Sequence, residues 1–264
     1  MLENEATIRL TAFLGMLAVM AIWEVATPRR RHDIPRLIRW SNNFALVVLD
    51  TALVRLLFPV LAVGAAIAAD ANGWGVLNWL GTPGWAAVVI AFLLLDLAIY
   101  AQHVAFHAVP VLWRLHRMHH ADLEFDLSTG IRFHPLEIIL SMLIKLAVVV
   151  AIGAPPEAVL VFEIVLNATA IFNHGNVRLP RALDRLVRLV LVTPDMHRVH
   201  HSVLREETDS NFGFNLPWWD WIFGTYRAQP KAGHTKMEIG LEEFRDSREL
   251  WLDRLLTQPF RRGR

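Results

Sequence analysis

Histidines at helical spacing are the residues of this sequence that are best suited to chemistry. One segment reads HVAFHAVPVLWRLHRMHH and holds five of the chain's 12 histidines. Positions i, i+3 and i+4 of a helix share one face, so His103 and His107 can converge on one point. The same spacing relates His116, His119 and His120. We therefore expect both groups to act as clusters.

A third cluster repeats this spacing further along the chain, at His197, His200 and His201. Neutral imidazole is the commonest metal ligand and suits zinc, copper and iron. A lone histidine is more often a surface or hydrogen-bonded core residue, but three clusters at helical spacing favour metal binding. Together they exceed the four ligands of a tetrahedral zinc site. The pattern predicts one multinuclear site with two metal ions.

The composition indicates where such a site must be built. Hydrophobic residues make up 54% of the 264-residue chain, which is too apolar for a typical soluble enzyme and indicates a membrane protein. The absence of cysteine excludes disulfides, thiolate nucleophiles and cysteine-bound iron–sulfur clusters. The net charge of +1 gives no indication of nucleic-acid binding.

Five apolar runs are long enough to be membrane helices. They cover residues 8–26, 44–69, 85–102, 136–153 and 157–172. A basic flank, rather than a small-residue cleavage site, follows the first run, so we expect an anchor and not a signal peptide. Asp50 and Arg55, within the second run, should face protein or a polar pathway rather than lipid. We predict an all-α, polytopic membrane protein with a cytosolic, histidine-rich cap for two metals.

The runs also suggest a division of the chain. We expect N-terminal spans and loops in residues 1–84, a catalytic domain with three spans in residues 85–227, and a cytosolic tail in residues 228–264. Within the tail, the mixture of Glu, Arg and Leu after Gly233 favours a cytosolic helix with a solvated end.

The distribution of arginine predicts the orientation, because short basic loops stay in the cytoplasm. Arginines follow the first span, whereas the loop 70–84 has no basic residue and should lie outside. All the candidate histidines, from His103 to His201, then fall on the cytoplasmic side. The bias towards Ala, Leu and Arg favours a bacterial inner membrane.

Several polar residues could support the histidines. Asp96 lies on the helical stripe that leads to His103 and could orient a ligand imidazole, or it could make a hydrogen bond between helices. Asn176, Asp195, Asp209 and Asn211 are further candidates for hydrogen bonding around the site. In the segment from Asp209 to Arg227, polar residues alternate with aromatic ones, so it could form a rigid support or a membrane-interface belt.

Three further features leave alternatives open. His134 is followed by proline, so it is either a ninth ligand or part of a helix start. His174 should be delivered to the same side by a helical hairpin. Residues 183–192 form a basic amphipathic segment that lies either at the membrane interface or on a solvent-exposed face.

The motifs HVAFH, HRMHH and HRVHH, joined by RFHPLE, FNHGN and SNFGFNLPWWDWIFGTYR, resemble the fatty acid hydroxylase (sterol desaturase) superfamily over roughly residues 96–227. The resemblance implies an oxygen-dependent, non-haem di-iron enzyme that acts on lipids at the cytosolic membrane face. His174 matches an additional ligand position of the sterol-type members, and His134 matches a recurrent family position. The residues that match the three ligand boxes are His103, His107, His116, His119, His120, His197, His200 and His201.

This reading has consequences for partners. We expect two iron ions, with zinc able to occupy the site in purified protein, and O2 as a co-substrate. No G-x-G-x-x-G motif follows a strand, so electrons should come from a separate ferredoxin or cytochrome-type donor with its reductase. The substrate could be a sterol or hopanoid, a carotenoid, a fatty acyl chain or an ether lipid, and the reaction hydroxylation or desaturation.

Two other functions compete with this one. A membrane zinc hydrolase of lipids would use a metal-bound water and a carboxylate base such as Glu137, Asp195 or Glu206. A noncatalytic metal- or haem-binding protein would leave most of the clustered histidines unexplained, because haem needs only one or two axial ligands.

Overall fold

The computed structural model describes residues 2–261, and within them the regular structure is helical. Only an isolated antiparallel bridge between Ser202 and Ile239 interrupts this pattern in the described part of the chain. The prediction of an all-α protein is confirmed.

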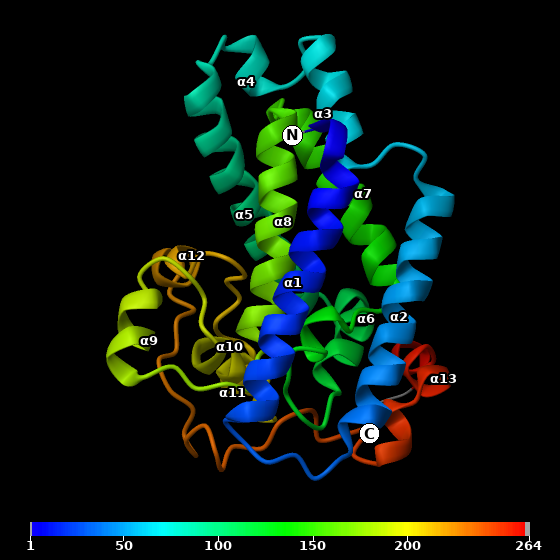
Figure 1. The fold of residues 1–264 in the computed structure, drawn as a ribbon, viewed down its shortest axis with the longest axis vertical. Helices are drawn as coiled ribbons and strands as arrows, with labels where there is room; N and C mark the ends of the chain where they lie inside the picture. Colours follow the sequence, from blue (N-terminus) through cyan, green and yellow to red (C-terminus); the bar gives the residue numbers. More distant parts are fainter. Residues whose placement is uncertain (1, 262–264) are drawn as a thin grey trace.

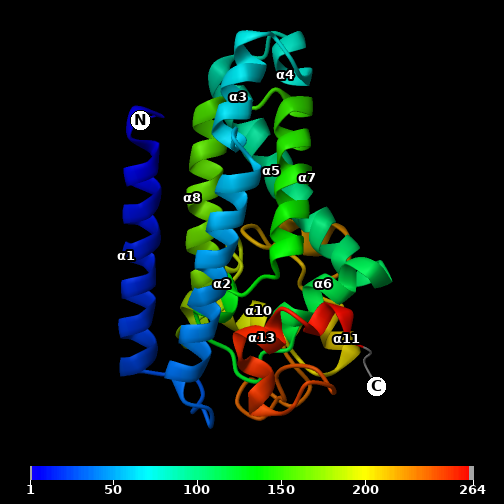
Figure 2. The same ribbon diagram turned by 90° about the vertical axis from the view of Figure 1, so that its right-hand side faces the viewer.

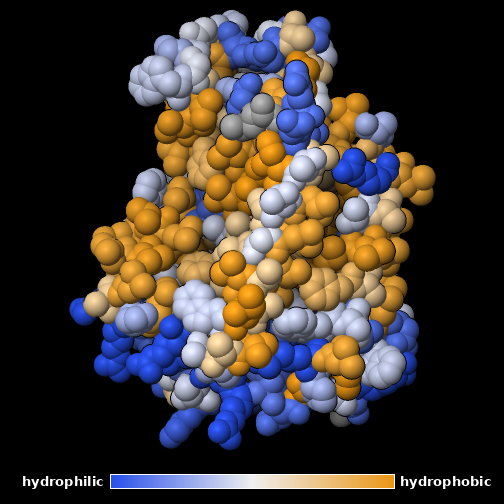
Figure 3. Space-filling model, viewed as in Figure 1, coloured by the Kyte–Doolittle hydropathy of each residue, from blue (hydrophilic) through white to orange (hydrophobic). Residues whose placement is uncertain are grey.

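Five long helices stand side by side in a bundle (Figures 1 and 2). They are α1 (Glu5–Ala26), α2 (Arg36–Leu57), α5 (Gly84–Ala108), α7 (Pro135–Ile152) and α8 (Pro156–Asn173). Five helical segments are long and apolar enough to cross a membrane. On the face that Figure 3 draws, a broad apolar band crosses the bundle, and polar residues gather at the end that carries α10 (Pro194–His200) and α11 (Arg205–Thr208). The chain is an integral membrane protein.

The second span differs from the continuous run expected over residues 44–69. Its helix begins earlier, at Arg36, and α2 ends at Leu57, before α3 (Ala62–Ala71) begins. Phe58 is extended (φ −118°, ψ 92°) because Pro59 disfavours a helical conformation in the residue that precedes it. The span therefore contains a bend that hydropathy alone does not reveal.

The end of the bundle opposite the histidines is closed by α3, the short α4 (Val76–Trp79) and their connections (Figure 1). Gly75 has a φ of +92°, and a Cβ there would lie 2.1 Å from the backbone nitrogen of Gly153. Only glycine permits this approach between the α3–α4 connection and the α7–α8 turn.

An ion-pair group joins three helices within the apolar band. Glu163 of α8 accepts hydrogen bonds from Arg9 of α1 (2.5 Å) and Lys145 of α7 (2.7 Å). Charged groups at membrane depth require such partners. These contacts hold α1 and α7 against α8.

The C-terminal tail is not the helix with a solvated end that we predicted. Up to Arg261, where the described residues end, it is irregular, with only the short turns η3 (Ser247–Leu250), α13 (Leu252–Leu255) and η4 (Gln258–Phe260). The guanidinium of Arg117 donates to the carbonyls of Gln258 (2.6 Å) and Arg261 (2.5 Å), so the tail packs on α6 (Pro110–His120). Gly240, with φ +102°, breaks the helical pattern. The last arginines of the tail, Arg262 and Arg264, lie outside the described residues.

Candidate metal centre

Three helix ends deliver the clustered histidines. The last turns of α5 carry His103 and His107, and α6 (Pro110–His120) carries the next cluster. The third cluster comes from α10 (Pro194–His200). Proline occupies the first turn of both α6 and α10, where its missing N–H costs nothing.

Nine histidines meet at the polar end of the bundle and form two groups. In each group the candidate ligand atoms lie within 4.8 Å of one another. The rings of His120 and His201, one from each group, have centroids 4.5 Å apart, so the groups adjoin. The first group contains His103, His107, His116, His120 and His200, and the second contains His119, His174, His197 and His201. The structure thus brings the three predicted clusters and His174 together.

In the first group the imidazoles are oriented through Nδ1. This atom is hydrogen-bonded to the Phe212 carbonyl in His103 (2.8 Å), to the Ser210 carbonyl in His200 (2.7 Å), and to a carboxylate in His116. A neutral imidazole that donates through Nδ1 carries a bare lone pair on Nε2. The Nε2 atoms of all five members are buried without a hydrogen-bond partner among the described residues. Such atoms are suited to a metal ion.

In the second group, ring nitrogens lie so close together that neutral imidazoles alone cannot satisfy their hydrogen-bonding requirements. Nδ1 of His119 donates to the Arg132 carbonyl (3.1 Å), and Nδ1 of His174 donates to the Ala170 carbonyl (2.8 Å). Their Nε2 atoms are then both acceptors, yet they lie 3.2 Å apart, and Nε2 of His197 lies 3.1 Å from that of His174. Two acceptors cannot hydrogen-bond to each other. A cation among them fits this donor set.

Burial favours the neutral form of four of these imidazoles, those of His119, His174, His200 and His201. It lowers the pKa of His174 and of His200 to about 3. Burial, together with neighbouring imidazoles, also places the pKa of His119 and of His201 well below the usual range. Metal ligation requires the deprotonated nitrogen, so the site is prepared for a cation at neutral pH.

A buried ionic network supports the loop between α6 and α7. Arg39 of α2 donates to Asp122 (2.8 Å) and to Asp126 (2.5 Å), and all three side chains are fully buried. Arg132 donates to the Met118 carbonyl (3.0 Å). This network fixes the loop that provides the carbonyl for His119. Sequence reasoning missed it, although paired acids in DLEFD were a signal.

Glu137 is a second residue whose role the sequence did not reveal. Its carboxylate accepts a 2.7 Å hydrogen bond from Nδ1 of His116, and both side chains are buried. From the sequence we expected Glu137 only as a candidate base of a hydrolase. The structure instead makes it a carboxylate that orients an imidazole.

Of the five predicted supporting residues, Asp209 contacts an imidazole, with 3.4 Å between its Oδ1 and Nδ1 of His107. Asp96 does not orient an imidazole directly, because Oδ2 accepts from the indole of Trp219 (2.8 Å) and the backbone of Leu216 (3.3 Å). It thus makes the alternative contact, a hydrogen bond between segments.

The other three supporting residues hold backbone segments in place. Asn176 donates to the Arg30 carbonyl (2.8 Å), and Asp195 accepts from the Arg29 guanidinium (3.1 Å), so both bind the basic loop after α1. Asn211 donates to a carbonyl of α10 (2.9 Å). Their effect on the histidines is therefore indirect.

His134 does not join either group. Its Nδ1 accepts from the Leu136 backbone N–H (3.2 Å), which caps the start of α7, and its Nε2 lies 3.2 Å from the Leu256 carbonyl. Both ring nitrogens are used, and this geometry matches the helix-start alternative.

The apolar bundle and the buried imidazoles define a class: integral membrane proteins that carry a histidine-rich centre able to hold metal ions. Residues 88–225, just over half of the chain, match the family model described as fatty acid hydroxylase. The chain belongs to the fatty acid hydroxylase family, as the resemblance of its motifs predicted.

Relatives of known function act on different lipids. The chain is 27% identical to ornithine lipid hydroxylase OlsE of Rhizobium tropici over 86% of its own length and 69% of that protein's. It is 32% identical to human alkylglycerol monooxygenase over 53% of its length, which is only 30% of the relative. Rat cholesterol 25-hydroxylase is 30% identical over 61% of this chain and 53% of the relative. No solved structure matches the chain.

Proposed function

We propose that this protein is a membrane-bound, non-haem di-iron oxygenase that hydroxylates or desaturates a lipid with O2 and externally supplied electrons. The convergence of nine buried histidines into two adjoining groups supports this most strongly. The names of the relatives, which include lipid hydroxylases, a monooxygenase and a desaturase, agree with it. Iron bound by both groups would supply the oxidising power for a C–H bond and share the required electrons.

The protein's own residues prepare this chemistry. The carbonyls of Phe212 and Ser210 and the carboxylate of Glu137 orient imidazoles of the first group towards one point. The helices and the packed tail bury the rings, which excludes water from the centre. A lipid substrate would approach from the bilayer, where the apolar band meets the polar cap.

The competing zinc hydrolase has less support from the geometry. Its three candidate bases are engaged elsewhere: Glu137 with His116, Asp195 with Arg29 and Arg198, and the exposed Glu206 with Lys231. A general base needs a carboxylate that can reach the attacking water. Nine histidines also exceed what one catalytic zinc requires.

We further propose that the metal site faces the cytoplasm of a bacterial cell. The basic loop after α1 binds Asp195 and Asn176, next to the third cluster and His174, so the arginines and the histidines share one end of the bundle. Short basic loops stay on the cytoplasmic side. A ferredoxin or cytochrome-type donor would reach the site from there.

The test begins with metal content. Protein purified in detergent should contain two metal ions per chain by plasma mass spectrometry, and iron reconstitution with a reductant and O2 should give oxygen uptake. Membrane lipids incubated with this protein should gain a hydroxyl group or a double bond in mass spectra. One zinc per chain, with no oxygen uptake after iron loading, would favour the hydrolase.

A further inference from the structure

A short amphipathic helix, α9 (Arg181–Val187), lies on the surface at the histidine end of the bundle (Figure 1). All seven of its residues are described, and none of them is buried. Four aliphatic side chains of this helix and the turn after it are exposed, namely those of Leu183, Leu186, Leu189 and Val190. A contiguous apolar patch that is exposed in this way marks a contact with a partner molecule or a membrane.

A second exposed apolar group lies beside this helix. It consists of α12 (Trp218–Ile222) and the residue that follows it. The indole of Trp218 donates to the carbonyl of Leu189 (2.7 Å), which ties α12 to the turn after α9. The two groups therefore form one patch, which we call the α9–α12 surface. Its exposed apolar side chains are Leu183, Leu186, Leu189, Val190, Trp221, Ile222 and Phe223.

The α9–α12 surface is continuous with the apolar band of the bundle. In Figures 1 and 3, which share one view, α9 and α12 lie at the left, where an apolar lobe joins the band and hydrophilic residues lie below it. Exposed tryptophans mark both ends of the band: Trp79 and Trp85 at the end closed by α4, and Trp221 at α12. Tryptophan is enriched at both membrane–water interfaces. The surface thus lies at the level of the interface on the histidine side.

Arginines accompany this apolar patch. Arg178, Arg181 and Arg185 are exposed. Arg188, by contrast, is buried and pairs with Asp184 (2.7 Å), so it supports the fold. An interfacial helix combines apolar side chains that enter the leaflet with basic side chains that meet anionic headgroups. The exposed arginines therefore give this surface a charge complementary to acidic lipids.

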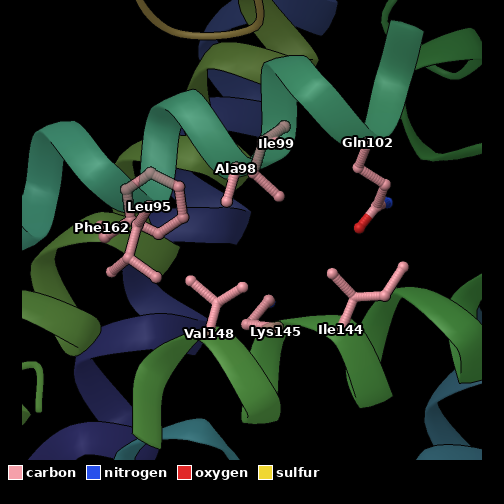
Figure 4. A pocket seen from close by; sticks show the side chains of 8 residues that line it. All are labelled: Leu95, Ala98, Ile99, Gln102, Ile144, Lys145, Val148 and Phe162. Atoms are coloured by element: carbon pink, nitrogen blue, oxygen red, sulfur yellow. The ribbon is translucent and has the colours of Figure 1, made fainter. Parts of the chain in front are cut away.

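The bundle offers this surface no apolar groove between α5 and α7. The ring of Phe223 stacks on that of Tyr100 of α5, with centroids 5.4 Å apart, so the end of α12 is held against one face of that helix. Another face of α5 packs against α7, and Figure 4 shows the side chains that line this contact. The space left between them is about 10 Å³, which is no more than one water molecule requires. The exposed side chains cannot withdraw into this contact.

We propose that the α9–α12 surface is an in-plane membrane contact. Its apolar side chains enter the leaflet on the histidine side, and Arg178, Arg181 and Arg185 bind the headgroups of anionic phospholipids there. This is the interface alternative for residues 183–192. The inference goes beyond the proposed function, because it requires neither a metal nor a reaction. A second copy of the chain fits less well, since the surface continues a band that already faces lipid.

Quenchers placed in lipid or in water test the apolar contact. The chain has no cysteine, so Leu186→Cys and, in a separate protein, Leu204→Cys can each carry a single NBD fluorophore. Leu204 is the matched control, because it is an exposed leucine that precedes α11 on the polar end. The full chain is placed in nanodiscs of phosphatidylcholine and phosphatidylglycerol. We expect doxyl-labelled phospholipid to quench the fluorophore at position 186 several-fold more than at position 204, and aqueous iodide to show the reverse order.

Two other results would overturn the proposal. Iodide quenching at position 186 equal to that at position 204 would make this a solvent-exposed face. Protection from both quenchers would assign the surface to a protein contact, and disulfide-linked dimers of Leu186→Cys would identify a second copy of the chain. If Leu186→Cys fails to fold, Ile222→Cys places the fluorophore on α12, where the same quenching order is expected.

Charge substitutions test the headgroup contact. Arg181→Gln combined with Arg185→Gln removes two charges from the surface, and Lys231→Gln combined with Lys236→Gln removes two from the C-terminal tail as the control. At equal amounts of quencher, doxyl-phosphatidylglycerol should quench position 186 more than doxyl-phosphatidylcholine, because the acidic lipid is enriched there. The arginine pair should bring the ratio of the two close to one, and the lysine pair should leave it unchanged. An equal ratio in both variants would refute the headgroup contact.

Discussion

Removing the carboxylate of Glu137 should weaken metal binding more than removing that of Asp209. The Glu137–His116 hydrogen bond is short (2.7 Å) and both side chains are at most 5% exposed. Asp209 is 3.4 Å from His107, is 39% exposed and also pairs with Arg205. Loss of a residue that orients a ligand typically costs 10–100-fold in metal affinity, or about 1.4–2.7 kcal/mol. We expect Glu137→Ala to fall in this range and Asp209→Ala at or below its lower end.

The assay is competition with a chelator of known affinity, followed by metal analysis of the repurified protein. Glu137→Gln provides the matched control, because its amide oxygen can still accept from Nδ1 of His116 and should preserve part of the affinity. Thermal unfolding with excess chelator would separate a folding defect from a binding defect. Wild-type affinity in Glu137→Ala, or a larger loss in Asp209→Ala, would refute the assignment of Glu137 as the principal orienting carboxylate.

Three other changes have defined outcomes. His119→Ala should lower the metal content and abolish oxygen uptake, whereas His134→Asn, which keeps an acceptor at the start of α7, should retain both; equal losses would contradict the proposed ligand set. Arg39→Leu removes the cation that bridges two buried aspartates and leaves only Arg132, 3.7 Å from Asp122, so it should lower the free energy of unfolding by about 3–5 kcal/mol, measured by denaturant titration; a loss below 1 kcal/mol would show that the network is dispensable. Burial lowers the pKa of His234 to about 4 although Asp195 opposes the shift, so stability present at pH 7 should decline as pH falls below about 6.5, the unfolded value. His234→Gln should reduce this decline in thermal unfolding between pH 7 and pH 5, and an unchanged slope would assign it to other groups.

The histidines could be found from the sequence because the ligand pattern is local. His103 and His107 are neighbours on one helix face, as are His197 and His200. The sequence spacing of each pair predicts this. The apolar runs gave the spans for the same reason, since hydropathy is a property of a continuous segment. Hydropathy did not predict the bend after Leu57, because the bend depends on a single proline.

The groups that orient the imidazoles could not be found in this way. Phe212 and Ser210 act through backbone carbonyls, which every residue type possesses, so their residue types do not indicate that they orient an imidazole. The Arg39–Asp122 pair joins segments 83 residues apart, and only the packing of α2 against the loop after α6 brings them together. For His134, the sequence could not decide between ligand and cap, because both roles place a histidine before a proline.

The buried ionic network around Arg39 contributes no carboxylate to the two histidine groups, and this separation has a physical reason. Each buried Nε2 without a partner costs about 1–3 kcal/mol, so a folded cluster of neutral imidazoles is expensive until cations satisfy it. The surrounding structure must hold the rings in position against that cost. Arg39 and Arg132 do so together with Asp122 and Asp126, two positive and two negative charges that neutralise one another, and they leave the Nε2 atoms of the site free of competing protein donors. A carboxylate placed among the imidazoles would instead raise their pKa and favour protons over metal ions. The one carboxylate that does touch the first group at short range, Glu137, contacts Nδ1, on the far side of the ring from the metal-facing nitrogen.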